Sequence, residues 1–207
     1  MKIHSFSHRV GYLQSKLSKK ELNHVNKMIN NKKSRMNNNL AGNISNSYVL
    51  PTTDSYFLKN IMAPNIEEYL KNYKDIVPKV LTKDCPFCLD KLWVNFQKKH
   101  EFNPPHLHTG VFSFVIWTQI PYDYEKECKL NFIKDSNNKC PGSFSFLHTD
   151  FKGQVCTFEY HLSKKDEGTM LFFPANLMHQ VFPFYTSDKE RISISGNVCL
   201  DSTRAIS

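Results

Sequence analysis

Three histidines have the types of neighbours and the spacing that a metal site needs. His106 and His108 stand one residue apart in the segment Phe-Asn-Pro-Pro-His-Leu-His, where two prolines stiffen the backbone. If this segment is extended, both imidazole rings point to the same face of a strand. A third histidine, His179, follows later in the chain. Two histidines at strand spacing with a distant third predict a metal site more often than a structural role.

One arginine lies in a pattern that could bind an acid. Arg191 begins the alternating stretch Arg-Ile-Ser-Ile-Ser, which is typical of a half-buried strand. Residues two apart in a strand share a face, so Arg191, Ser193 and Ser195 are expected on one side. An arginine offers a planar fork of donors, and beside a hydroxyl it can grip a carboxylate. The alternative is an ordinary hairpin with a surface arginine and a core histidine.

Two further strands are expected to form the walls of the site. Residues 92–97 alternate at a period of two, and apolar side chains occupy one face. The other face carries Trp93, Asn95 and Gln97. This set suits the wall of a polar cavity better than a solvent-exposed face. Residues 111–120 are almost purely apolar and predict a core strand, in which Trp117 is a second candidate for the wall. Core packing explains either tryptophan equally well.

Residues 1–88 are expected to be a mostly helical lead-in and support. Ser18–Glu21 has the spacing of a capping box, which predicts a helix to about residue 31. A second helix is predicted from Pro64, with Asn65 as its N-cap and acidic residues in its first turn. These helices are expected to buttress a sheet.

Residues 89–200 are expected to be the β core of a single domain. Strands are predicted at residues 143–148, 155–162 and 169–173, where short apolar runs end at turn residues. The polar stretch 122–141 is predicted to be a long loop over one mouth of a barrel, and such loops often carry substrate contacts.

Composition limits the class of protein. The chain has 207 residues, 40% hydrophobic and 13% aromatic, which is enough to bury the core of one domain. No apolar run approaches the roughly 20 residues of a membrane span. The N-terminus lacks an apolar signal core, so we place the protein in a cytoplasm and expect no membrane partner.

Charge and cysteine content give weaker signals. The net charge of +8 permits an acidic partner such as nucleic acid, but the basic residues do not alternate with aromatic ones as in a nucleic-acid-binding surface. The pair Cys85 and Cys88 has no second close pair of cysteines to complete a zinc site. We therefore expect mostly free thiols, as in a reducing compartment.

The histidines and the arginine together resemble the site of iron(II)- and 2-oxoglutarate-dependent oxygenases. The segment ending in His106-Leu-His108 is similar to the first-ligand motif of the prolyl-4-hydroxylase-like branch. The segment from Leu171 through His179 to Arg191-Ile-Ser is similar to its distal-histidine and co-substrate motif. The resemblance covers residues 90–200 and is closest to oxygenases common in marine bacteriophages. It implies a mainly β fold, a double-stranded β-helix (jelly-roll) with N-terminal buttressing helices.

The resemblance also implies a reaction and roles for individual residues. Fe(II) would be held by His106, His108 and His179, which with Arg191 form the catalytic set. 2-Oxoglutarate and O2 would be co-substrates, with ascorbate as an auxiliary reductant, and a C–H bond of an unidentified substrate would be hydroxylated with release of succinate and CO2. Peptidyl proline and nucleic acid are both candidate substrates. Arg191, with Ser193 alongside, would bind the far carboxylate of 2-oxoglutarate, and Asn95 or Gln97 would steady its C1 carboxylate.

His108 departs from the family pattern, in which aspartate or glutamate usually takes this position. Three histidines with an open coordination position are also a zinc arrangement. A cupin-like carboxylate-binding protein or a zinc protein without redox activity is therefore the alternative. A virion or assembly protein that keeps the fold without the chemistry is a third hypothesis.

A rival ligand pair, His148 and Asp150, has the H-x-D spacing that the family usually shows. Members of the family place about four strands between the first ligands and the distal histidine. Four predicted strands separate His108 from His179, whereas only two separate Asp150 from His179. We therefore favour His106 and His108.

Overall fold

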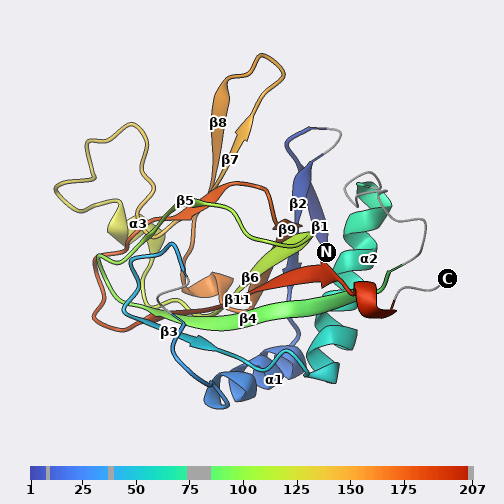
Figure 1. The fold of residues 1–207 in the computed structure, drawn as a ribbon. Helices are drawn as coiled ribbons and strands as arrows, with labels where there is room; N and C mark the ends of the chain where they lie inside the picture. Colours follow the sequence, from blue (N-terminus) through green and yellow to red (C-terminus); the bar gives the residue numbers. More distant parts are fainter. Residues whose placement is uncertain (8–9, 37–39, 74–84, 205–207) are drawn as a thin grey trace.

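Two antiparallel β-sheets face each other in a computed structural model that describes residues 1–7, 10–36, 40–73 and 85–204 (Figure 1). The larger sheet has the strand order β1-β2-β9-β6-β11-β4-β3, and the smaller has the order β5-β10-β7-β8. The first strands are β1 (Lys2–Ser5), β2 (Gly11–Lys16), β3 (Asn46–Val49), β4 (Phe87–Gln97), β5 (Asn103–His106) and β6 (Phe112–Gln119). The later strands are β7 (Phe144–Thr149), β8 (Val155–Tyr160), β9 (Thr169–Pro174), β10 (His179–Val181) and β11 (Arg191–Leu200). The predicted mainly β jelly-roll is confirmed.

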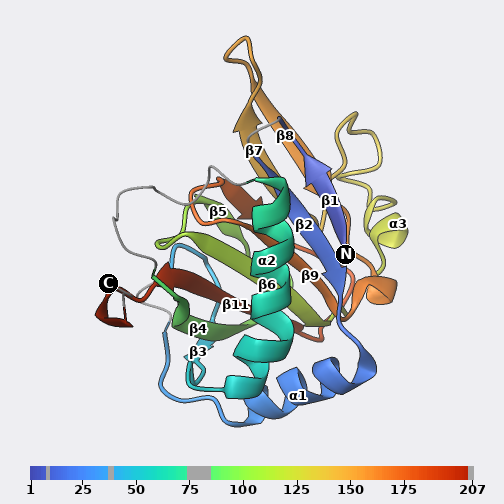
Figure 2. The same cartoon turned by 90° about the vertical axis from the view of Figure 1, so that its right-hand side faces the viewer.

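Helices cover the outer face of the larger sheet, as Figure 2 shows for α2. They are α1 (Lys19–Asn30), the π-helical turn η2 (Phe57–Met62) and α2 (Ala63–Asn72). Short helical segments also occur at α3 (Tyr124–Glu127), η4 (Lys164–Asp166) and η5 (Ser202–Arg204). Within the described ranges, no helix has both the length and the apolar character that a membrane span requires.

The larger sheet therefore has an apolar cluster on each face. On its outer face Val25 and Tyr69 of the helices pack with sheet residues such as Phe114, and all three are at most 1% exposed. On its inner face Trp117 packs with Phe146 of the smaller sheet. Burying both faces fixes the register of the central strands, since a slip of one residue would exchange the two sets of side chains.

The predicted first helix is confirmed as α1, whereas the predicted second helix begins earlier than expected. The capping box of α1 is present, with Ser18 and Glu21 bonded to each other's backbone N–H groups. Pro64 does not open its helix, because the preceding π-helical turn runs directly into α2. A π-helical turn can accommodate a proline, which has no N–H to donate. Asn65 is no cap either; its side chain donates to the Ile61 carbonyl (2.6 Å).

Two strands near the N-terminus were missed by the sequence analysis. β2 pairs with β9 and β1 pairs with β2, so the first residues of the chain extend the larger sheet. The strand β3 pairs with β4 on the other side of that sheet. The segment 1–88 thus supplies three strands as well as the buttressing helices.

Candidate active site

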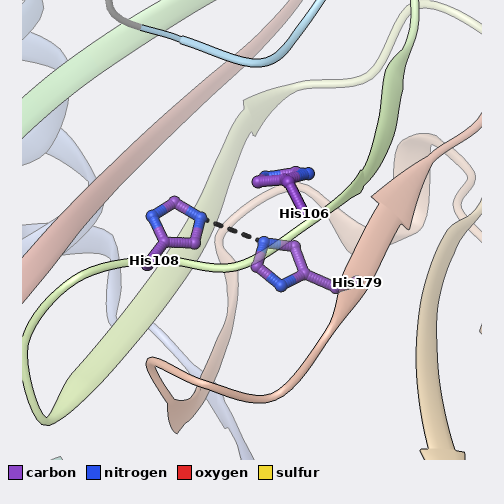
Figure 3. Close-up of side chains that lie close together, drawn as sticks. All are labelled: His106, His108 and His179. Carbon is purple, nitrogen blue, oxygen red and sulfur yellow. Dashed lines mark hydrogen bonds between the residues drawn. The ribbon is translucent and has the colours of Figure 1, made fainter.

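Three imidazole rings converge in a cavity between the two sheets (Figure 3). His106 ends β5 and lies directly opposite His179, which begins β10. His108 follows two residues after His106, in the loop that leads to β6. One ring nitrogen from each histidine lies within 4.8 Å of the others, a group that could hold a metal ion. The predicted convergence of these side chains is therefore seen in the structure.

The hydrogen bonds of the three rings determine which nitrogen is free. In each ring Nδ1 lies within hydrogen-bond distance of a carbonyl or amide oxygen, which can only accept. The pairs are His106 with the Pro104 carbonyl (2.7 Å), His179 with the Leu177 carbonyl (2.9 Å) and His108 with Asn197 Oδ1 (3.1 Å). The proton therefore lies on Nδ1, and each Nε2 presents a lone pair.

The distance between two of these lone pairs fits a shared cation. Nε2 of His108 and Nε2 of His179 are 3.0 Å apart. With both protons on Nδ1, no hydrogen bond can join the two Nε2 atoms, and their lone pairs repel. Two nitrogens bound to one ion at about 2.1 Å and at a right angle would be about 3.0 Å apart. This pair of nitrogens thus fits a shared divalent ion.

Burial keeps the triad neutral. Burial, and to a smaller extent the neighbouring His106, lower the pKa of His108 to about 4. The pKa of His179 lies well below its usual value, mainly because of burial and then because of the two other histidines. Burial also lowers the pKa of His106. Neutral imidazole is the form that binds metals, so the triad is in its binding form at neutral pH.

Arg191 is buried at another part of the cavity, with only 1% of its surface exposed. Its Nε and Nη2 donate to Gln97 Oε1 (3.2 and 2.6 Å). Its Nη1 donates to the Tyr122 hydroxyl (2.5 Å) and to the Gly142 carbonyl (2.6 Å), and Nη2 also donates to the Phe182 carbonyl (3.2 Å). These contacts engage all five N–H donors of the guanidinium, and every acceptor is neutral.

The other predicted site residues line the same cavity, whose volume is about 280 Å³. The ring of Trp93 stacks on that of His108, with centroids 5.4 Å apart. Asn95 accepts a hydrogen bond from the Ser47 hydroxyl (2.6 Å), which steadies its amide. The lining residues predicted from the sequence are Trp93, Asn95, Gln97, His106, His108, Trp117, His179, Arg191 and Ser193.

The rival pair lies elsewhere. The ring of His148 stacks on Phe6, with centroids 4.5 Å apart. Asp150 Oδ1 accepts from the N–H groups of Lys152 and Gln154 in the turn between β7 and β8. Neither His148 nor Asp150 contributes to the lining of the cavity. Four strands, β6 to β9, separate His108 from His179, as the sequence analysis counted.

Two residues that contact the site were not singled out from the sequence. Asn197 contacts His108, and its position six residues after Arg191 in the same alternating strand was the signal that could have found it. Tyr122 contacts Arg191 from a loop, and no local sequence pattern predicts this contact. Burial raises the pKa of Tyr122, so its hydroxyl keeps its proton and donates it to the Gly142 carbonyl (2.6 Å).

Comparison with protein families gives a match over this β core. A family described as "Putative 2OG-Fe(II) oxygenase" matches residues 91–197, where 2OG is 2-oxoglutarate. The chain belongs to this family. The matched residues of this oxygenase include the three histidines and Arg191. Comparison with the curated proteins finds no relative.

Solved structures share the fold of the oxygenase at low sequence identity. An oxidoreductase of the 2OG-Fe(II) oxygenase family from Burkholderia pseudomallei is 13% identical, with a TM-score of 0.57 over 91% of this chain and 85% of that one. A Pseudomonas putida prolyl-4-hydroxylase is 12% identical, with a TM-score of 0.50 over 90% and 91%. A viral collagen prolyl hydroxylase from Paramecium Bursaria Chlorella virus-1, in complex with 2OG, is 14% identical, with a TM-score of 0.51 over 90% and 94%.

Proposed function

We propose that this oxygenase hydroxylates a C–H bond of a substrate still to be identified, with succinate and CO2 as co-products. The observation that carries the proposal is the convergence of one ring nitrogen from each of three histidines in a cavity that also contains a buried arginine, whose acceptors within the described chain are all neutral. Bound Fe(II), together with 2-oxoglutarate and O2, supplies the oxidising chemistry, and the protein supplies binding, orientation and a shaped cavity.

His106, His108 and His179 would hold the iron. Imidazole is a suitable ligand for iron, and the three rings already present deprotonated Nε2 atoms. The site lacks the carboxylate that the family usually supplies, so it places no negative charge on the ion. The dianionic co-substrate would be the main source of negative charge beside the metal.

Arg191 would bind the far carboxylate of 2-oxoglutarate, with Ser193 two residues along the same face of β11. Gln97 Oε1 now accepts from the Nε and Nη2 edge of the guanidinium, the edge that can bind a carboxylate in bidentate fashion. We therefore assign Gln97 to the far carboxylate, whereas the resemblance suggested the C1 carboxylate. The diacid would displace its amide. Asn95 remains the candidate for the C1 carboxylate, and Trp93 and Trp117 would form walls of the substrate cavity.

Formation of succinate tests the proposal directly. The chain would be prepared without metal, loaded with Fe(II) in the absence of oxygen, and then given 2-oxoglutarate, ascorbate and air. Succinate should form, and the His179→Ala variant should form none. Metal analysis of the purified chain tests the alternative of a zinc protein without redox activity, because three imidazoles also suit zinc. Tightly held zinc, with no succinate from the iron-loaded chain, would replace this proposal by the non-redox one.

The candidate substrates and the compartment are proposed from less specific observations than the metal site. Two of the solved structures described above are prolyl hydroxylases by name, so a proline-containing peptide is the first substrate to test. Nucleic acid is the second, because the net charge is +8. All six cysteines lie in the described ranges and are free thiols, which fits a cytoplasm, that of the host for a phage protein.

The variant Gln97→Glu tests the role of Arg191 without removing it. The new carboxylate would pair with the guanidinium, fill the edge that the diacid needs, and leave the partners of Arg191 in place. We expect 2-oxoglutarate binding to weaken by about 2–5 kcal/mol, because the diacid must displace a buried charge pair. Calorimetric titration of the anaerobic Fe(II) protein measures this. Gln119→Glu is the matched control, since Gln119 donates to the Glu190 carbonyl (2.7 Å) and does not line the cavity. Unchanged binding in Gln97→Glu would remove Arg191 from the co-substrate site.

A further inference from the structure

We propose that Asn197 is the positioning residue of the metal site, acting through His108. It holds the ring of the histidine that stands where the family usually has a carboxylate. The inference depends on the proposed function only in assuming that the three histidines bind a divalent metal ion.

The amide of Asn197 is fixed on both sides. Asn197 lies on β11, is 5% exposed, and shares the cavity face of the strand with Arg191, Ser193 and Ser195. Its Oδ1 lies 3.1 Å from His108 Nδ1, and its Nδ2 donates to the Thr109 hydroxyl (2.9 Å). With its NH2 group toward Thr109, the amide turns its oxygen toward Nδ1 of His108.

His108 needs such a contact more than its two partners do. His106 and His179 bond backbone carbonyls two residues before them, so their orientation follows from the local path of the chain. His108 stands in the loop after β5, and its Nδ1 contacts a side chain 89 residues away. Stacking on Trp93, at an interplanar angle of 16°, fixes the plane of the ring. The hydrogen bond that Nδ1 donates to Asn197 then fixes the rotation of the ring within that plane and directs Nε2 toward His179.

The neighbouring strand β4 is irregular beside Asn197. In the pairing of β11 with β4, Asn197 lies opposite Lys91 and Val198 lies opposite Leu89, so Asp90 of β4 is an extra residue between them. Such bulges bend the strand that carries them and are common beside active sites. The bulge therefore lies next to the residue that reaches His108, while β11 keeps a regular register with β6 at this point.

The choice of an amide also sets the charge of the site. Asn197 accepts the Nδ1 proton without adding a negative charge, so His108 remains an ordinary neutral donor. An aspartate at this position would accept the same proton and make Nε2 a stronger donor. Substitutions by leucine and by aspartate therefore separate the loss of positioning from a change of charge.

Titration with Co(II), in the absence of oxygen and of 2-oxoglutarate, tests the inference on the full chain. We expect Asn197→Leu to weaken Co(II) binding by about 10- to 100-fold and to alter the visible spectrum of the bound ion. Asn197→Asp should keep the spectrum and bind Co(II) at least as tightly as the original chain. The control is Asn65→Leu, a buried asparagine at 3% exposure that bonds Ile61 and Ser15, and it should leave affinity and spectrum unchanged.

The outcomes separate this inference from the proposed function. If the unaltered chain binds no Co(II), the metal site itself is wrong and both proposals fall. If the unaltered chain binds Co(II) and a folded Asn197→Leu variant gives the same affinity and spectrum, only the role of Asn197 is refuted. Should Asn197→Leu not fold, Asn197→Ser takes its place, because its hydroxyl is too short to reach Nδ1 and the same loss is expected.

Discussion

At the scale of single residues, burial of the triad couples its protonation to the stability of the metal-free chain. The pKa of His108 is about 4 in the folded chain against a usual value of 6.5, and burial is the main cause. An unfolded chain therefore takes up protons as the pH falls below about 6.5, while the folded chain does not. Protonation favours the unfolded state in this range.

We expect the free energy of unfolding to decrease as the pH is lowered from 6.5 toward 4, and to change less above 6.5 from this cause. Urea denaturation in the presence of a chelator measures it at a series of pH values. The variant His108→Gln should show a shallower decrease, because one depressed group is gone. His100→Gln, at an exposed position, is the control and should keep the original slope. An unchanged slope in His108→Gln would contradict the explanation.

The residue types of the site could be read from the sequence, but the groups that hold them could not. Histidines at strand spacing indicate a metal site, and an arginine at strand spacing from serines indicates a carboxylate-binding site. The triad and Arg191 were therefore predicted. Tyr122 contacts Arg191 from 69 residues away, and Asn197 contacts His108 from 89 residues away. Contacts at such separations depend on the tertiary structure, and only the alternation of β11 places Asn197 on the same face as Arg191.

At the scale of elements, the short helix α3 fastens the segment that leads into β11. Glu127 of α3 is fully buried and accepts from the N–H groups of Tyr185 and Thr186, both at 2.8 Å. It also accepts from the Thr186 hydroxyl (2.5 Å). The same segment provides the Phe182 carbonyl that accepts from Arg191. The predicted loop 122–141 thus has a structural role at the Arg191 end of the cavity.

We expect Glu127→Gln to lower the free energy of unfolding by about 1–3 kcal/mol, because an amide NH2 would face donors in a buried place. Urea denaturation at neutral pH measures the change. Glu125→Gln is the control, since Glu125 is exposed on the same helix. Equal stability of the two variants would show that the carboxylate of Glu127 does not hold the segment.

The predictability of the elements followed their pattern. The strands β6 to β9 alternate or run apolar between clear turns, and they were predicted close to their observed bounds, whereas the first five residues of β4 were missed. The strands β1 and β2 are short and mixed in polarity. β2 pairs with β9, which lies some 150 residues away in the chain, and β1 pairs with β2. The start of the second helix was misplaced because proline was taken as its first residue, whereas a π-helical turn precedes it.

At the scale of the whole molecule, the cavity is poor in negative charge. Arg191 lines it, and no carboxylate of the described chain is among the groups that shift the pKa values of the three histidines. A divalent ion on the triad would add to the positive potential. A dianion such as 2-oxoglutarate relieves this potential, so each ligand should favour the binding of the other.

We expect Co(II) to bind about 5- to 150-fold more tightly in the presence of saturating 2-oxoglutarate than in its absence. Anaerobic titrations with and without the diacid measure this ratio. The variant His108→Asp adds the carboxylate that the family usually has. Because this carboxylate already offsets part of the positive charge, 2-oxoglutarate should increase the Co(II) affinity of this variant by a smaller factor. A ratio near one in the unaltered chain would show that the neutral triad does not link the two ligands.

The pairing of His106 with His179 across β5 and β10 has a consequence for how the chain reaches its native state. Sliding one of these strands by a single residue would turn its imidazole to the opposite face of the sheet. A misaligned sheet would therefore offer the ion at most part of its coordination set. A metal ion bound during folding would stabilise only the aligned arrangement. The ion would therefore favour the correct register of the smaller sheet over a shifted one.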